Sequence, residues 1–149
     1  MTTTVNSQDY LNEKYMGMLA SSSGFTAERY NNSGSRISTV TASGSYLDWQ
    51  YVVTVFEKDA LKVYVNGKLA ASDTKEVDIK SLMTADAKTW IGHANWGDGE
   101  GFSGKMDDFR IYGKALSEEE IDALSAEAAL MERNRLIAEQ NSLITDTHF

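Results

Sequence analysis

Short runs of alternating apolar and polar residues dominate the first hundred residues of the chain. Such runs, rich in Val, Ile, Thr and Tyr and separated by Gly, Asn or Ser, have the period of two that is typical of half-buried strands. Leu61 and Val63, for example, fall on one face of their run, whereas Lys62 and Tyr64 fall on the opposite face, which we expect to be exposed to solvent. The pattern predicts strands at residues 14–22, 25–31, 36–42, 49–58, 61–67, 68–72, 88–95 and 105–113.

Two local signals, a hairpin and a helix start, stand out from this pattern. Asn66-Gly67 fits a type I′ turn, whose two central residues need positive φ, so the flanking strands should be adjacent and antiparallel. Ser117 and Glu120 have the spacing of a capping box, and apolar residues then recur at helical spacing to about Gln140. Successive hairpins followed by one helix indicate an all-β sandwich or barrel with a C-terminal α-helix.

Composition narrows the classes of protein to which the chain can belong. Its 149 residues fit one domain with a conventional core, and no apolar run approaches the roughly 20 residues that a membrane-spanning helix needs. The net charge of -8, without a block of basic residues, argues against nucleic acid and membranes as partners. The absence of cysteine excludes disulfides and thiolate zinc sites. The start has no signal-peptide pattern, so we expect either a cytoplasmic protein or a segment of a secreted one.

The order of features from Tyr46 to Leu124 resembles that of a known family. A Trp opens a strand in YLDWQYVV, and the Asn-Gly hairpin follows. An Ile-Gly pair comes next, in TWIGHAN, then a strand that ends in Tyr, in GFSGKMDDFRIY, and a helix start, in ALSEEEI. This order is similar to the laminin-G-like branch of the concanavalin A-like lectin and glucanase superfamily. The resemblance implies an antiparallel jelly-roll sandwich over residues 1–116, with a C-terminal helix and tail over residues 117–149.

The resemblance also implies that some strands of the family are missing from this chain. The family has further N-terminal strands, and no segment of this chain corresponds to them. The resemblance therefore implies a sandwich with an open edge. Because an unpaired edge strand invites association, we expect a neighbouring domain or a second copy of the chain to complete the sandwich.

A structural calcium ion at the last predicted strand is a further implication of the resemblance. Asp107 is the residue that matches the acid of the family, and Asp108 follows it. Calcium takes about six to eight oxygen ligands from carboxylates and backbone carbonyls. The alternative is that one or both carboxylates cap turns or face water.

Candidate ligand-binding residues lie in a Gly-rich loop and on the strand expected at residues 25–31. Trp96, beside Asn95 and Asp98, has the composition of a sugar-binding rim, where an aromatic face stacks on a pyranose. The alternative is a Trp96 that folds back over the edge of the sandwich. Arg29 and Tyr30 can line a concave sheet face. The alternative is that an aromatic residue on the solvent-exposed face packs on its neighbours in the sheet, which is the usual role of such residues. The tryptophans at strand starts should instead be packing residues: Trp49 and Trp90.

We do not expect catalysis from this domain. A retaining glycosidase needs two carboxylates about 5 Å apart. Asp107 and Asp108 are adjacent, so on a strand they would point to opposite faces. The sequence therefore predicts a non-catalytic carbohydrate-binding module for a polysaccharide or glycan, outside the cell or at its surface, in a larger protein such as a bacterial glycoside hydrolase. The alternative is a structural, protein-interaction or adhesion domain of a larger multidomain protein.

Overall fold

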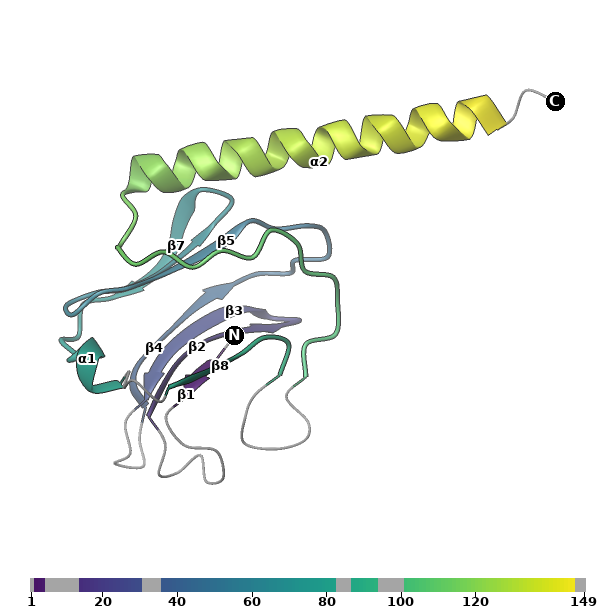
Figure 1. The fold of residues 1–149 in the computed structure, drawn as a ribbon. Helices are drawn as coiled ribbons and strands as arrows, with labels where there is room; N and C mark the ends of the chain where they lie inside the picture. The colour runs from purple at the N-terminus through teal and green to yellow at the C-terminus, as the bar shows by residue number, and fades with distance from the viewer. Residues whose placement is uncertain (1, 5–13, 31–35, 83–86, 94–100, 147–149) are drawn as a thin grey trace.

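The computed structural model describes residues 2–4, 14–30, 36–82, 87–93 and 101–146 (Figure 1). The strands are β1 (Thr2–Thr4), β2 (Tyr15–Ser21), β3 (Gly24–Tyr30), β4 (Arg36–Ser43), β5 (Val52–Phe56), β6 (Leu61–Val65), β7 (Lys68–Asp73) and β8 (Lys88–Trp90). The described residues also form the short helix α1 (Ile79–Leu82) and the long helix α2 (Glu118–Asp146). The strands make two antiparallel sheets, in the orders β4-β3-β2-β1-β8 and β5-β6-β7. The chain is thus mostly β with a C-terminal helix, as the sequence predicts.

The alternating pattern located β2 to β7 and the start of β8 correctly, with ends that differ by a few residues. The hairpin prediction is confirmed, because Asn66 has a φ of 51° and Gly67 a φ of 81°. These two residues join β6 to β7, with Val65 opposite Lys68. The pattern did not predict β1 or α1, which are too short to show a period.

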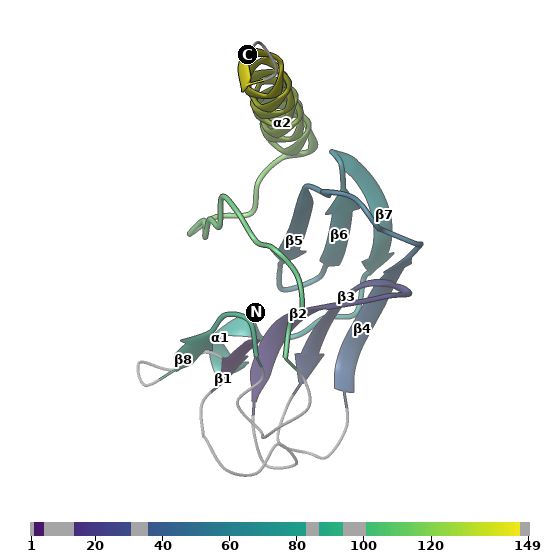
Figure 2. The same ribbon diagram turned by 90° about the vertical axis from the view of Figure 1, so that its right-hand side faces the viewer.

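The two sheets pack face to face on one side of the molecule. Ala27, Val40 and Ala42, from β3 and β4, form a buried cluster with Leu61 and Val63 of β6. Because side chains alternate along a strand, these residues define the inner face of each sheet. Figure 2 shows the sheets close together at β4 and β7 and apart on the opposite side. The sandwich is therefore closed along one edge and open along the other.

Helix α2 covers the outer face of the three-stranded sheet. Ser117 and Glu120 form the predicted capping box. The Ser117 amide donates to the Glu120 carboxylate at 2.8 Å, and the Glu120 amide donates to the Ser117 hydroxyl at 3.2 Å. Ile121 is fully buried against Tyr64 and Val55. The expectation that Tyr64 faces water is wrong, because the first turns of the helix cover that face and leave Tyr64 only 2% exposed.

Beyond its first turns, α2 extends past the sheets (Figure 1). Several large apolar side chains on this part of the helix are exposed: Leu130, Met131, Leu136, Ile137 and Leu143. Arg135 pairs with Glu132 and Glu139 along the same helix. Among the described residues, no helix combines the length and apolar character needed to cross a membrane.

The strand predicted at residues 105–113 is wrong, since this segment is irregular. Asp108, in its middle, has a φ of 50°, which interrupts an extended chain. Its apolar side chains are exposed, with Phe109 at 43% and Ile111 at 65%. An alternating pattern shows that a segment suits a sheet, but a strand also needs a neighbour to pair with. Here the segment crosses the open side of the sandwich between the two sheets (Figure 2).

Candidate functional site

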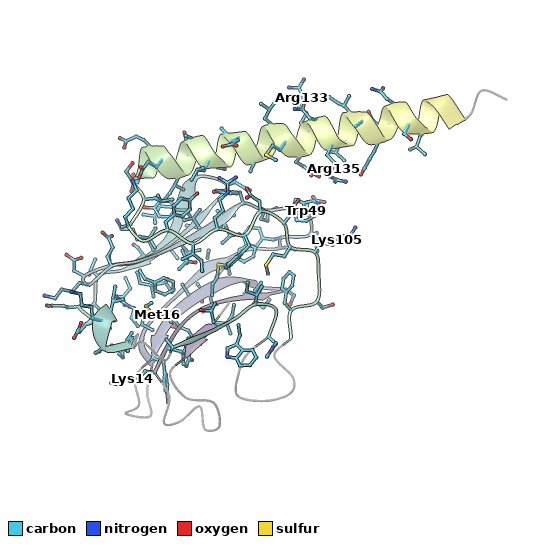
Figure 3. The ribbon with its side chains drawn as sticks, in the orientation of Figure 1. Lys14, Met16, Trp49, Lys105, Arg133 and Arg135 are labelled. Carbon is cyan, nitrogen blue, oxygen red and sulfur yellow. The ribbon has the colours of Figure 1, made fainter. Side chains whose placement is uncertain are left out.

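The open side of the sandwich forms a wedge between the inner faces of the two sheets. Met18 lies opposite Ala27 in the pairing of β2 with β3, so Met16 and Met18 belong to the inner face that the second sheet leaves uncovered. Trp49 lies just before β5 and across the wedge from Met16 (Figure 3). We use the name wedge for the hollow lined by Met16, Met18, Trp49, Thr54, Phe56 and residues 102–113.

Arg29 lies on the closed side of the sandwich, fully buried on the inner face of β3. Its guanidinium donates to the Glu57 carbonyl at 2.8 Å, the Lys75 carbonyl at 2.9 Å and the Ser38 hydroxyl at 3.0 Å. Burial lowers the pKa of Arg29, and the charge of Asp73 acts in the opposite direction. Arg29 therefore ties the two sheets together, and we do not retain it as a ligand-binding residue.

Asp73 takes part in the same network through the hydroxyl of Ser38, which donates to its carboxylate at 2.5 Å. This hydrogen bond lowers the pKa of Asp73 from its ordinary value of 3.8, and the backbone amides of Lys75 and Thr74 and the charge of Arg29 act in the same direction. The buried cation and this carboxylate are thus joined through one serine.

Tyr30 lies on the outer face of the five-stranded sheet and is only 5% exposed. Its ring stacks on Tyr15 with centroids 5.1 Å apart. The hydroxyl of Tyr15 donates to Glu28 at 2.7 Å, and Thr39 donates to the same carboxylate. Tyr30 therefore packs on the sheet, which was the alternative interpretation of this residue.

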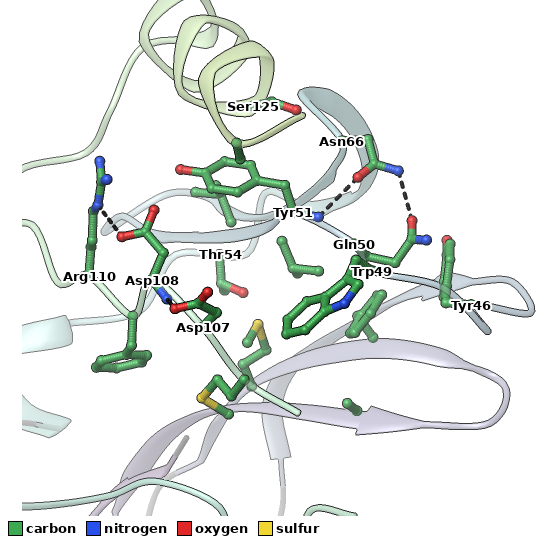
Figure 4. A pocket seen from close by; sticks show the side chains of 18 of the residues that line it. Tyr46, Trp49, Gln50, Tyr51, Thr54, Asn66, Asp107, Asp108, Arg110 and Ser125 are labelled. Carbon is green, nitrogen blue, oxygen red and sulfur yellow. Dashed lines mark hydrogen bonds and ion pairs between the residues drawn. The ribbon is translucent and has the colours of Figure 1, made fainter. Parts of the chain in front are cut away.

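An aromatic and polar surface borders the wedge where the chain enters β5 (Figure 4). Trp49 is 45% exposed there. The side chain of Asn66 accepts from the Tyr51 amide at 3.0 Å and donates to Gln50 at 2.7 Å. Tyr46 packs on Phe25, with ring centroids 4.8 Å apart. We call Tyr46, Trp49, Gln50, Tyr51, Asn66 and Tyr112 the aromatic rim.

Charged groups of the irregular segment meet the rim at Tyr51. Burial raises the pKa of the Tyr51 phenol, and Tyr112 and Asp108 add to this rise, whereas Arg110 opposes it. Hydrogen bonds to Tyr112 and Asp108 raise the pKa of Arg110. The Arg110 to Asp108 bond is 2.7 Å long. The irregular segment thus places a fixed cation and anion next to the exposed rings of the rim.

Asp107 and Asp108, the residues predicted to bind calcium, make hydrogen bonds within their own segment. The Asp107 carboxylate accepts from the Asp108 amide at 2.8 Å, and Asp108 pairs with Arg110. Both lie on the exposed irregular segment. Within the part of the chain that the structure describes, no group of three or more acidic or imidazole side chains gathers at one point. Among the described residues the two carboxylates thus have local partners, and calcium binding at Asp107 and Asp108 stays a prediction.

Three predicted ligand-binding residues, Trp96, Asn95 and Asp98, lie outside the described residues. Trp90 is half-buried, and its ring lies 4.8 Å from that of His93. Its indole nitrogen is buried and has no hydrogen-bond partner among the described residues.

Sequence reasoning missed the aromatic rim because it assigned Trp49 to the core. The signal available was the stretch GSYLDWQ between two strands, in which aromatic residues alternate with turn formers. That composition is typical of a loop that carries binding residues. The partner residues of the rim, Asn66 and Tyr112, come from distant parts of the sequence and could not be associated with it.

Comparisons with known proteins bear on this arrangement. The sequence model of a laminin G family, described as the concanavalin A-like lectin/glucanases superfamily, matches residues 2–122. No curated protein matches the chain. Among solved structures, an S-layer domain-containing protein from Clostridium thermocellum (residues 221-444) is similar, at 23% identity and a TM-score of 0.46. The similarity covers 74% of this chain and 63% of that one, so this chain spans less than two thirds of its length.

Proposed function

Because the chain belongs to the concanavalin A-like lectin/glucanases superfamily, we propose that it is a non-catalytic carbohydrate-binding module with a jelly-roll sandwich. In this proposal it serves a larger secreted or cell-surface protein, such as a bacterial glycoside hydrolase, and binds a polysaccharide or glycan. The observation that carries the proposal is the aromatic rim, with its half-exposed Trp49 next to ordered amides.

The chemistry of the rim suits a neutral sugar. An exposed indole offers an apolar face on which a pyranose ring can stack, and the polar edge of the ring then points to neighbouring donors and acceptors. Gln50 and Asn66 are held by hydrogen bonds to each other and to the backbone, so little side-chain freedom is lost when a ligand binds. The net charge of -8 also disfavours strongly acidic polymers.

The carboxylates next to the rim, Asp107 and Asp108, support binding better than hydrolysis. A glycosidase needs one carboxyl group free to protonate the leaving oxygen and a second one facing it. Asp107 accepts a backbone amide, and Asp108 pairs with Arg110, so neither is poised for proton transfer. This observation supports the non-catalytic part of the proposal.

Affinity electrophoresis against a panel of plant and microbial polysaccharides tests the proposal. We expect at least one polymer to retard the wild type, and Trp49→Ala to weaken binding about two- to twelvefold, because stacking on an aromatic ring contributes about 0.5 to 1.5 kcal/mol. Trp49→Phe should keep part of the binding. Leu143→Ala, on the exposed end of α2, serves as the control.

A parallel variant, Trp96→Ala, tests the loop that the sequence singled out, and runs with calcium and with a chelator test the proposed structural calcium. Loss of binding in Trp96→Ala but not in Trp49→Ala would move the site from the rim to the loop. Retardation by no polymer under any of these conditions would overturn the carbohydrate-binding proposal.

A protein-interaction domain is the second candidate, and a specific observation favours it. Residues 102–113 expose several large apolar side chains along the wedge: Phe102, Met106, Phe109, Ile111 and Tyr112. Several exposed apolar side chains along one hollow are typical of a protein-binding site. A module that binds only sugar would not need it.

A further inference from the structure

Strand β5 forms one edge of the three-stranded sheet, and in the described part of the chain no strand pairs with its outer side. The backbones of Tyr51 and Glu57 make hydrogen bonds of 2.8 Å on the β6 side. Because alternate residues of an antiparallel strand bond to the same neighbour, the amides and carbonyls of Val52, Thr54 and Phe56 point away from β6.

One side chain of β5 also lacks a partner. The hydroxyl of Thr54 is buried and makes no hydrogen bond with any described residue. Thr54 lines the wedge (Figure 4). Because buried polar groups are nearly always hydrogen-bonded, this hydroxyl marks a point at which a polar neighbour is missing.

Residues 105–113 run beside β5 of the same chain, and their side chains already alternate as in a strand. Asp108, Arg110 and Tyr112 all lie close enough to Tyr51 for their charges to act on the pKa of its phenol. Figure 4 shows Asp108 and Arg110 directed to the side of Tyr51. Every second residue of the segment therefore faces the same point at the start of β5.

The irregular form of this segment is held only weakly. Asp108 has a φ of 50°, a left-handed conformation that is less favourable than an extended one. Asp107 accepts from the Asp108 amide at 2.8 Å, and Arg110 donates to Asp108 at 2.7 Å. Both bonds are exposed, and exposed pairs contribute little. The irregular form also leaves large apolar side chains in water, with Phe109 43% and Ile111 65% exposed.

We propose that residues 105–113 form a strap that closes the wedge by pairing, as a fourth strand, with β5 of the same chain. In the closed form Asp107 and Phe109 face the wedge, because they alternate with the residues near Tyr51. The carboxylate of Asp107 then lies on the same face as the Thr54 hydroxyl and can accept its hydrogen bond. Closure thus provides partners for the outward groups of β5 and removes apolar side chains from water.

Closure also connects the strap to the aromatic rim. Tyr112 belongs to the strap, whereas Trp49, Gln50 and Asn66 lie outside it. A ligand that contacts both parts of the rim binds the closed form more tightly than the open form, so it shifts the equilibrium toward closure. This coupling rests on the proposed carbohydrate-binding function, but the strap itself does not.

Two substitutions at Asp108 test the strap without a ligand. Asp108→Gly tolerates a φ of 50°, whereas Asp108→Val, with its β-branched side chain, does not. Both variants lose the pair with Arg110, so their comparison isolates the backbone preference at this position. From the usual cost of the left-handed conformation, we expect the ratio of closed to open protein to be about five- to thirtyfold higher in Asp108→Val.

Amide hydrogen exchange at several protein concentrations measures this ratio. The amides that report closure are the outward ones of β5: Val52, Thr54 and Phe56. They should exchange at least about fivefold more slowly in Asp108→Val than in Asp108→Gly. The amides of Val53 and Val55, which bond to β6, should exchange alike in both variants and so show that both are folded. Equal exchange of the outward amides in the two variants would rule out the strap. Protection that appears only as the protein concentration rises would assign the pairing to a second copy and also rule it out.

The polysaccharide that retards the wild type most strongly tests the coupling. Its addition should slow the outward amides of β5 in the wild type, and Asp108→Val should bind it more tightly than Asp108→Gly. Binding that leaves these amides unchanged would refute the coupling. If no polysaccharide retards the wild type, the coupling fails together with the proposed function, and the comparison of the two Asp108 variants still decides whether the strap closes.

Discussion

Replacement of Arg29 by methionine should destabilise the domain more than any change at its surface. Arg29 is fully buried and makes three hydrogen bonds of 3.0 Å or less, which join β3 to the hairpin after β5 and to the chain after β7. Methionine fills similar space but leaves two carbonyls and a hydroxyl without their donor. Each such loss costs about 1 to 3 kcal/mol, and partial hydration reduces the total to about 3 to 5 kcal/mol.

Urea unfolding, followed by circular dichroism and tryptophan fluorescence, measures this cost directly. For a chain of this size the loss corresponds to a fall of roughly 10 to 15 °C in Tm. Arg110→Met is the matched control, because the exposed pair of Arg110 with Asp108 should contribute less than about 1 kcal/mol. If Arg29→Met costs no more than Arg110→Met, Arg29 does not tie the sheets together, and it returns to the set of ligand-binding candidates.

Other predictions concern the helix, the hairpin and acid stability. Ile121→Ala, at a fully buried position, should cost about 2 to 4 kcal/mol in urea unfolding, and a smaller loss would show that α2 does not dock on the sheet. Gly67→Ala should lower the free energy of unfolding by about 1 to 2 kcal/mol, because φ is 81° and the new Cβ would lie 2.9 Å from the Asp122 carboxylate. Adding Asp122→Ala to this variant should recover part of the lost stability. The pKa of Asp73 is lowered, so its stabilisation is complete above the unfolded pKa near 3.8 and is lost as pH falls through the folded value. The urea midpoint should therefore fall below about pH 4, and Asp73→Asn should flatten that fall.

Local chemistry made the strands and turns predictable. The type I′ turn at Asn66-Gly67 and the capping box at Ser117 depend on residues within three positions of each other, so the sequence contains all the information they need. The family was recognisable for a similar reason, because its features occur in a fixed order along the chain. The candidate site was less predictable, since Trp49, Asn66 and Tyr112 meet only after the sheets have packed.

The sequence by itself determined which segments suit a sheet, where the hairpin turns and where the last helix begins, because these properties arise from the period of the side chains and from single backbone angles. Only the tertiary structure decided which of those segments are paired and which faces are covered. The alternating pattern predicts that Tyr64 faces solvent, but Tyr64 is buried because α2 lies over it. The pattern of residues 105–113 predicts a strand, but the segment is irregular. Pairing needs the edge of a neighbouring strand at the right distance, and the packing of the whole sandwich sets that distance.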